Sequence, residues 1–156
     1  MRFAWLKGGH QTQQREVINQ EDIAKNQVIR ECYCHNGHDV LTDQISFNGH
    51  PGLTLKLRSQ TQEGLLSISP VIGDRERKFL DFERRPGEVV EICCPTCSEP
   101  FPVYNQCDCG AHLVALFTSP NASFSQCVGI CQRIGCLHSE LISERNLRLY
   151  SRTYYF

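Results

Sequence analysis

Two pairs of cysteines separated by a short spacer constrain this chain more than any other feature of its sequence. Cys94 and Cys97 form a Cys-x-x-Cys pair around a proline, and Cys107 and Cys109 form a second pair that precedes Gly110. A tight turn can point both thiolates of a pair at one ion, and a glycine can adopt the positive φ that turns backbone N–H groups towards sulfur. This spacing predicts a tetrahedral metal site rather than isolated buried cysteines.

Ten cysteines in 156 residues is a high count, which secreted disulfide scaffolds also reach. The opening residues 1–7 are followed by glycines and polar residues, whereas a secretion signal continues as an apolar segment. No apolar run approaches the length that crosses a membrane. We therefore interpret the cysteines as metal ligands in a reducing compartment, and we predict a cytoplasmic protein that does not bind membranes.

The remaining cysteines form two further groups of candidate ligands. Cys32 and Cys34 make up a second knuckle before an Asn-Gly turn, and the third group is Cys127, Cys131 and Cys136. Three neighbouring histidines, His35, His38 and His138, are also candidate ligands, although histidines beside thiolate sites are more commonly surface or supporting residues. Cys93 is the spare thiol in every arrangement considered and is predicted to be structural.

The cysteines suffice for two four-ligand sites, which can be completed in two ways. In the local arrangement, one site consists of Cys94, Cys97, Cys107 and Cys109. The ligands of the other site come from Cys32, Cys34 and the third group, and His138 is a possible further ligand. The long-range arrangement joins Cys32 and Cys34 to Cys94 and Cys97, and joins Cys107 and Cys109 to two thiols of the third group. Loop closure favours the local arrangement, but only by a logarithmic term, so both remain open.

The paired knuckles resemble those of zinc-ribbon and rubredoxin-like proteins. In addition, Cys32-Tyr33-Cys34 followed by Gly37-His38-Asp39, with Cys94-Pro95-Thr96-Cys97 downstream, resembles the small zinc-binding subunit of acetone carboxylase-type enzymes. In that family a Cys-x-Cys-Gly-His-Asp and a distal Cys-Pro-x-Cys hold zinc. The likeness covers these two knuckles alone, and His35 and Asn36 interrupt the first. It implies the long-range arrangement and a role within a larger enzyme.

Between the knuckles the sequence predicts β structure. Apolar and polar residues alternate in segments 44–49, 53–58, 66–69, 78–82 and 88–92, with turn residues between them, and 111–118 is an apolar strand after the ribbon. This pattern predicts a mainly β chain with little helix, arranged as an antiparallel meander, sandwich or small barrel. The predicted core consists of Ile45, Phe47, Leu53, Leu55, Leu57, Leu66, Ile68, Phe79, Phe82, Val90 and Ile92.

The chain divides into four predicted parts. These are an extended N-terminal arm over 1–31, a cysteine knuckle and antiparallel β region over 32–93, the zinc ribbon and third cysteine group over 94–138, and a C-terminal tail over 139–156. Within the tail a helix is expected over 140–149. The aromatic residues Tyr150, Tyr154, Tyr155 and Phe156 are expected to anchor the tail, or alternatively to bind a partner.

Motifs for catalysis are absent from the sequence. It contains no His-Glu-x-x-His, nucleophile elbow, phosphate loop or paired carboxylates, and all-thiolate metal sites are usually closed and structural. We therefore expect a protein without catalysis of its own: an accessory or small subunit that binds about two zinc ions and acts through a protein partner.

Two alternatives remain. The first is a redox module, because four sulfur ligands also accept iron or an iron–sulfur cluster. The second is a nucleic-acid-binding ribbon. A net charge of −1 disfavours it, although two clusters of basic residues exist, one of Arg75, Arg77, Lys78, Arg84 and Arg85 and the other of Arg145, Arg148 and Arg152.

Overall fold

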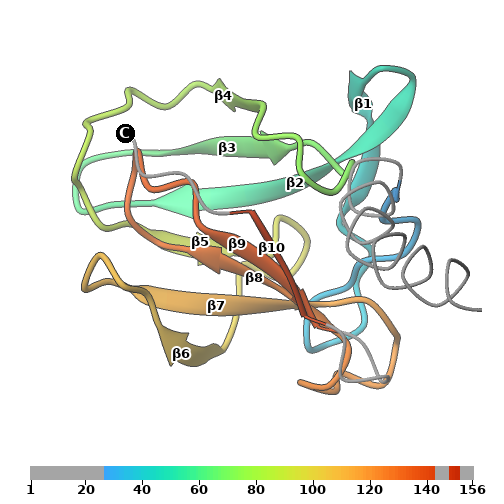
Figure 1. The fold of residues 1–156 in the computed structure, drawn as a ribbon. Coiled ribbons are helices and arrows are strands. Elements are labelled where there is room, and N and C mark those ends of the chain that lie inside the picture. Colours follow the sequence, from blue (N-terminus) through green and yellow to red (C-terminus); the bar gives the residue numbers. More distant parts are fainter. Residues whose placement is uncertain (1–26, 143–147, 152–156) are drawn as a thin grey trace, which may run out of the picture.

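The computed structural model describes residues 27–142 and 148–151, which form two five-stranded antiparallel sheets (Figure 1). The first sheet contains β1 (Leu41–Phe47), β2 (His50–Arg58), β3 (Glu63–Ile68), β4 (Arg77–Leu80) and β5 (Glu91–Cys93). The second contains β6 (Val103–Gln106), β7 (His112–Phe117), β8 (Cys127–Cys131), β9 (Ser139–Ile142) and β10 (Arg148–Ser151). The prediction of a mainly β, antiparallel fold is confirmed.

Strand β2 organises the first sheet, whose order is β1-β2-β3-β4. One edge of β2 pairs with β3. The opposite edge pairs with β1 near the beginning of β2, where Leu53 lies opposite Leu41, and with β5 near its end, where Lys56 lies opposite Cys93. The alternation of leucines along β2 explains its position, because Leu53, Leu55 and Leu57 all face the core. The second sheet has the order β10-β9-β8-β7-β6, so consecutive strands are neighbours throughout it.

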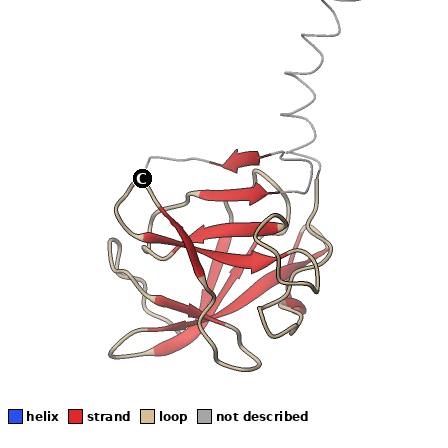
Figure 2. Cartoon of the chain, turned by 90° about the horizontal axis from the view of Figure 1, so that it is seen from below, coloured by secondary structure: helices blue, strands red, loops and turns tan. Residues whose placement is uncertain are grey.

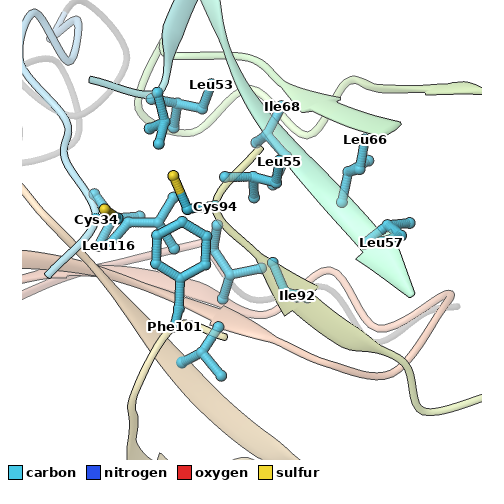
Figure 3. Close-up of a cluster of buried hydrophobic side chains, with 14 of the residues drawn as sticks. Cys34, Leu53, Leu55, Leu57, Leu66, Ile68, Ile92, Cys94, Phe101 and Leu116 are labelled. Atoms are coloured by element: carbon cyan, nitrogen blue, oxygen red, sulfur yellow. The ribbon is translucent and has the colours of Figure 1, made fainter. Parts of the chain in front are cut away.

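The two sheets pack against each other as a sandwich over one apolar core (Figures 1 and 2). The first sheet contributes Leu53, Leu55, Leu57, Leu66, Ile68 and Ile92, and the second contributes Val114, Leu116, Val128 and Ile130. Figure 3 shows the thiols of Cys34 and Cys94 among these side chains, beside Leu116 and Phe101. Of the predicted core, all residues are buried except Ile45 and Phe79, which are partly exposed.

Strand β7 is buried on both of its faces, as its continuous apolar sequence predicts. Val114 and Leu116 face the core between the sheets, whereas Leu113 packs with cysteines on the outer face. Ala115 and Phe117 also lie on that outer face, in a smaller apolar cluster with Cys127. The second sheet therefore has an interior side and a covered outer side.

The C-terminal prediction is wrong where the structure describes it. Residues 139–142 and 148–151 are strands rather than parts of a helix, because β9 pairs with β8 and β10 pairs with β9. Backbone pairing with an existing sheet outweighs the weak helical preference of this segment. Tyr150 lies on β10 opposite Glu140. The remaining aromatic tail residues and most of the predicted arm fall outside the described residues.

Among the described residues, no helix is long and apolar enough to cross a membrane.

Candidate metal centres

Four ligand-type side chains converge where the two sheets meet. Cys34, His38, Cys94 and Cys97, called cluster 1 below, place their ligand atoms within 4.8 Å of one another. All ten cysteines are free of disulfide bonds. Cys34 and Cys94 are buried, while His38 and Cys97 are partly exposed, so the cluster lies at the margin of the core.

The first half of cluster 1 is a tight turn attached to the second sheet. Tyr33 exchanges both backbone hydrogen bonds with Phe117 at the end of β7. The chain then reverses: the N–H of Gly37 donates to the carbonyl of Cys34, and the N–H of Cys34 donates to the carbonyl of His38. Gly37 takes a φ of 87°, which its lack of a side chain permits. This turn brings His38 Nδ1 to 3.4 Å from Cys34 Sγ.

The second half continues from β5 of the first sheet. The N–H of Ser98 donates to the carbonyl of Cys94, the N–H of Cys94 donates to the carbonyl of Glu99, and Ser98 has a φ of 61°. The N–H of Thr96 points at Cys94 Sγ over 3.4 Å. A backbone N–H directed at sulfur, as that of Thr96 is, also occurs around metal-bound thiolates.

The distances in cluster 1 suit a tetrahedral ion. A Zn–S bond of about 2.3 Å implies S···S edges of about 3.8 Å, and a shorter Zn–N bond implies S···N edges of about 3.5 Å. The measured separations are 3.9 Å between Cys34 Sγ and Cys97 Sγ, and 3.4 Å between Cys34 Sγ and His38 Nδ1. A disulfide requires about 2.0 Å. The residues present therefore fit a metal ion.

A second set, Cys107, Cys109, Cys131 and Cys136, forms cluster 2 with its ligand atoms also within 4.8 Å. Cys107 Sγ lies 3.7 Å from Cys136 Sγ, and Cys109 Sγ lies 3.5 Å from Cys131 Sγ. These values again match the edges of a tetrahedron of thiolates around one ion. Cluster 2 can thus hold an ion through four sulfur atoms.

Cluster 2 is built entirely within the second sheet, on its outer face. Cys107 and Cys109 lie in the β6–β7 turn, where Gly110 has a φ of 99° and donates its N–H to the carbonyl of Cys107. Cys131 ends β8 and pairs with Leu113 of β7, and Cys136 follows in the next turn. Sheet register therefore brings the end of β8 beside the β6–β7 turn.

The thiol pKa values differ within each cluster. In cluster 1 burial raises the pKa of Cys94; burial also acts to raise that of Cys97, but hydrogen bonds from the Glu99 N–H and the Asn36 side chain lower its pKa to about 6. In cluster 2 burial raises the pKa of Cys107 to about 11 and also raises that of Cys131.

Cys109 is the exposed ligand of cluster 2. Its limited burial acts to raise its pKa, but hydrogen bonds from the Ala111 N–H and the Arg133 guanidinium lower the pKa to about 6. Each cluster thus combines one thiol of lowered pKa, Cys97 or Cys109, with at least one thiol of raised pKa. Since thiolates repel one another, a bound cation is the ordinary way to ionise all of them together.

The structure does not bring together the four cysteines of the local arrangement. Cys94 and Cys97 join Cys34 and His38 instead, and Cys107 and Cys109 join Cys131 and Cys136. The observed pairing therefore replaces the local one and follows the long-range arrangement, with His38 in place of Cys32. The reason is topological: β5 and the 32–38 turn meet at the sheet junction, whereas the β6–β7 turn lies beside β8.

Two candidate ligands, Cys32 and Cys127, lie in neither cluster. Cys32 precedes the paired residue Tyr33, and its thiol is not among the ligand atoms that converge in cluster 1. Cys127 begins β8 and Cys131 ends it, so about 13 Å of strand separates them. Both are fully buried, and burial raises the pKa of Cys32.

The other predicted positions are also placed. Cys93 is buried outside both clusters, where burial raises its pKa to about 11. His35 and His138 lie outside the clusters; His138 is buried, with Nε2 3.7 Å from Glu140 Oε2. His38 was one histidine among three candidates, and the Asn-Gly turn between it and Cys34 was the sequence signal that could have singled it out.

No protein-family model matches this chain, and comparisons with curated proteins and with solved structures find no match.

Proposed function

We propose that clusters 1 and 2 each bind one zinc ion, that both ions are structural, and that the protein serves as an accessory or small subunit of a larger assembly. The observation that carries this proposal is the tetrahedral spacing of two complete four-ligand sets. Four protein ligands leave no coordination position for water or substrate, which is the arrangement of structural rather than catalytic zinc.

Zinc is favoured over iron by the composition of cluster 1. A three-cysteine, one-histidine set is common in structural zinc sites, whereas rubredoxin-like iron is held by four thiolates. Cluster 2, with four cysteines, accepts either metal on chemical grounds. Iron in cluster 2 would make the protein a redox module, so the metal content of that cluster decides between the two functions.

A zinc ion in cluster 1 would join the two sheets. Its ligands Cys34 and His38 belong to the turn held by β7, and Cys94 and Cys97 follow β5 of the other sheet. Structural zinc contributes about 10–16 kcal/mol of apparent binding free energy in small zinc domains, which becomes folding free energy when no site exists in the unfolded chain. The ion would therefore stabilise the sandwich at the junction of its layers.

The accessory role is supported by the resemblance to the small zinc-binding subunit of acetone carboxylase-type enzymes. The resemblance depends on Cys32, Cys34, His38, Cys94 and Cys97, and four of these five make up cluster 1. Closed metal sites without a catalytic motif are consistent with a subunit that supports chemistry performed by another chain. The partner would be a protein.

The decisive experiment measures the metal content of the anaerobically purified full chain by plasma mass spectrometry, together with its visible spectrum. We expect about two zinc ions per chain and no visible absorption, because zinc thiolates are colourless. Removal with a strong chelator should lower the thermal midpoint and release both ions. Protein that is folded and metal-free, with unchanged stability, would contradict the proposal, and iron with charge-transfer bands would replace it with the redox function.

The accessory role has its own test. The tagged chain, purified at native expression level from its own cells, should elute as a stoichiometric complex with one defined partner. Cys97→Ser should weaken that complex if cluster 1 shapes the docking surface. Elution of the wild-type chain alone, with turnover of its own, would contradict the role.

A further inference from the structure

A cavity is lined by Leu57 and Leu66 together with residues that follow β8 of the second sheet. Figure 3 shows the side chains of Leu57 and Leu66 at one end of the core. The volume of the cavity is about 330 Å³, at the lower end of the range for small-molecule sites. Most of its wall is apolar and comes from both sheets and the loop between β4 and β5: Leu57, Leu66, Phe79, Pro86, Val90, Ile92, Ile134 and Leu137. This wall would exclude water from the body of a ligand.

The polar part of the cavity is strongly basic. Four arginines, Arg75, Arg77, Arg84 and Arg133, contribute to its lining, and no acidic residue does so among the described residues. Three arginines of the first basic cluster in the sequence, Arg75, Arg77 and Arg84, thus line an apolar pocket. An apolar wall with cations and no acid suits an anion that carries an apolar body.

Three of these arginines already have partners. Arg133 donates to the carbonyls of Gly87 and Cys109, over 2.8 and 3.4 Å. The Arg84 guanidinium lies 5.1 Å from the centre of the Phe79 ring, in cation–π range. Arg75 is also not free of a partner. These contacts hold three of the four cations in position at the rim.

Arg77 differs from the other three. It is partly buried at the start of β4, and among the described residues no hydrogen bond or ion pair engages its guanidinium. Burial lowers the pKa of Arg77 to about 10, so it stays charged at neutral pH. No acidic side chain among the described residues pairs with this charge, and an anion in the cavity would supply the missing partner.

Cluster 2 offers a competing explanation for Arg77. A zinc ion with four thiolates carries a net charge of −2, and the charges of Cys136 and Cys131 act on Arg77 more weakly than burial does. Arg77 could therefore serve only to balance that charge. This explanation requires no cavity, whereas Arg77 also lines a cavity of ligand size.

We propose that this cavity is a binding site for a small amphipathic carboxylate, whose carboxylate group pairs with Arg77 and whose apolar body packs against the inter-sheet wall. Bidentate pairing is the geometry in which guanidinium and carboxylate match. Cys131 of cluster 2 also lines the cavity, so the site adjoins that cluster. Its ligand chemistry differs from metal binding, and it extends beyond the proposed zinc function.

The test uses the zinc-loaded full chain, titrated calorimetrically with octanoate as the probe. Acetate supplies the carboxylate without the body, 1-octanol supplies the body without the charge, and inorganic phosphate tests for a site that accepts any anion. We expect octanoate to bind at least tenfold more tightly than each of the other three. Equal binding of phosphate or of octanol would overturn the proposal, as would no binding of octanoate.

Substitutions test whether Arg77 and the cavity wall contact octanoate. Arg77→Gln should weaken octanoate binding at least tenfold, whereas Arg85→Gln, at an exposed arginine outside the cavity, should leave it unchanged. Gln132→Trp adds bulk to the lining and should block octanoate while Arg77 remains. Zinc content is measured on every variant, so loss of metal is distinguished from loss of the ligand. If Arg77→Gln lowers zinc retention but leaves octanoate binding intact, Arg77 only balances charge and the proposal is wrong.

Discussion

Cys34 and Cys97 lie 63 positions apart in the sequence, yet their sulfur atoms are 3.9 Å apart. Cys34 follows a residue paired with β7, and Cys97 follows β5, so this contact joins the two sheets of the sandwich. Strands β1 to β4 are, in effect, an insertion between the two halves of cluster 1. A metal ion in this position would close a long loop as well as fill a site.

The pairing of the ligands predicts how the metal content responds to substitution. Cys97→Ser and Cys109→Ser should each remove one ion of two, because they belong to different clusters, and the double variant should bind none. In the local arrangement both residues would serve the same ion, and the double variant would retain one. Plasma mass spectrometry after passage over a chelating resin distinguishes these outcomes. Cys93→Ser, outside both clusters, is the control and should retain two.

Arg133 should strengthen metal binding by cluster 2 without touching the ion. Its guanidinium donates to the Cys109 carbonyl and helps to lower the pKa of Cys109. Arg133→Gln should therefore lower the affinity of cluster 2 for its ion by about 10–100-fold. Competition with a chromophoric chelator measures the two affinities separately. The exposed Arg85→Gln is the matched control. An equal loss of affinity at both clusters would show a general loss of stability instead.

The thiol pKa values predict the order of alkylation in the zinc-free chain at pH 7. Cys97 and Cys109, each with a pKa of about 6, are mainly thiolates and should react with iodoacetamide first. Their rates should fall as the pH drops through about 6, since protonation removes the nucleophile. Peptide mass spectrometry identifies the sites, and added zinc should protect both. Earlier labelling of the buried Cys32 or Cys93 would contradict this order.

Gly129 on β8 should tolerate no side chain. A Cβ atom there would meet the Tyr104 ring and hydroxyl, and that hydroxyl donates to the Glu140 carboxylate. Gly129→Ala should therefore destabilise the zinc-loaded protein by about 1–3 kcal/mol, measured by urea unfolding. In a Tyr104→Ala background the same substitution should cost much less, because the obstructing ring is gone. If Gly129→Ala lowers the free energy of unfolding equally in both backgrounds, the clash with Tyr104 is not the cause of the destabilisation.

Local pattern was sufficient to predict the mainly β class and the apolar residues that the first sheet contributes to the core. Alternating leucines at 53, 55 and 57 encode one buried face of β2, and the apolar run 111–118 encodes a strand buried on both sides, independently of what packs against them. Strands β6 and β8 to β10 lack such alternation. They exist because neighbouring strands supply hydrogen-bond partners, so a segment-by-segment interpretation predicted a helix over 140–149.

The sequence by itself identified most of the candidate ligands, because the turns around Cys94-x-x-Cys97 and Cys107-x-Cys109 each present two thiols to one ion. It did not determine which turns meet. Each knuckle offers similar ligands, and the entropy of closing a loop changes only logarithmically with its length, so local and distant pairings differ little in free energy. Sheet register and the packing of β5 against the 32–38 turn made that choice, selecting His38 over Cys32 and Cys131 over Cys127.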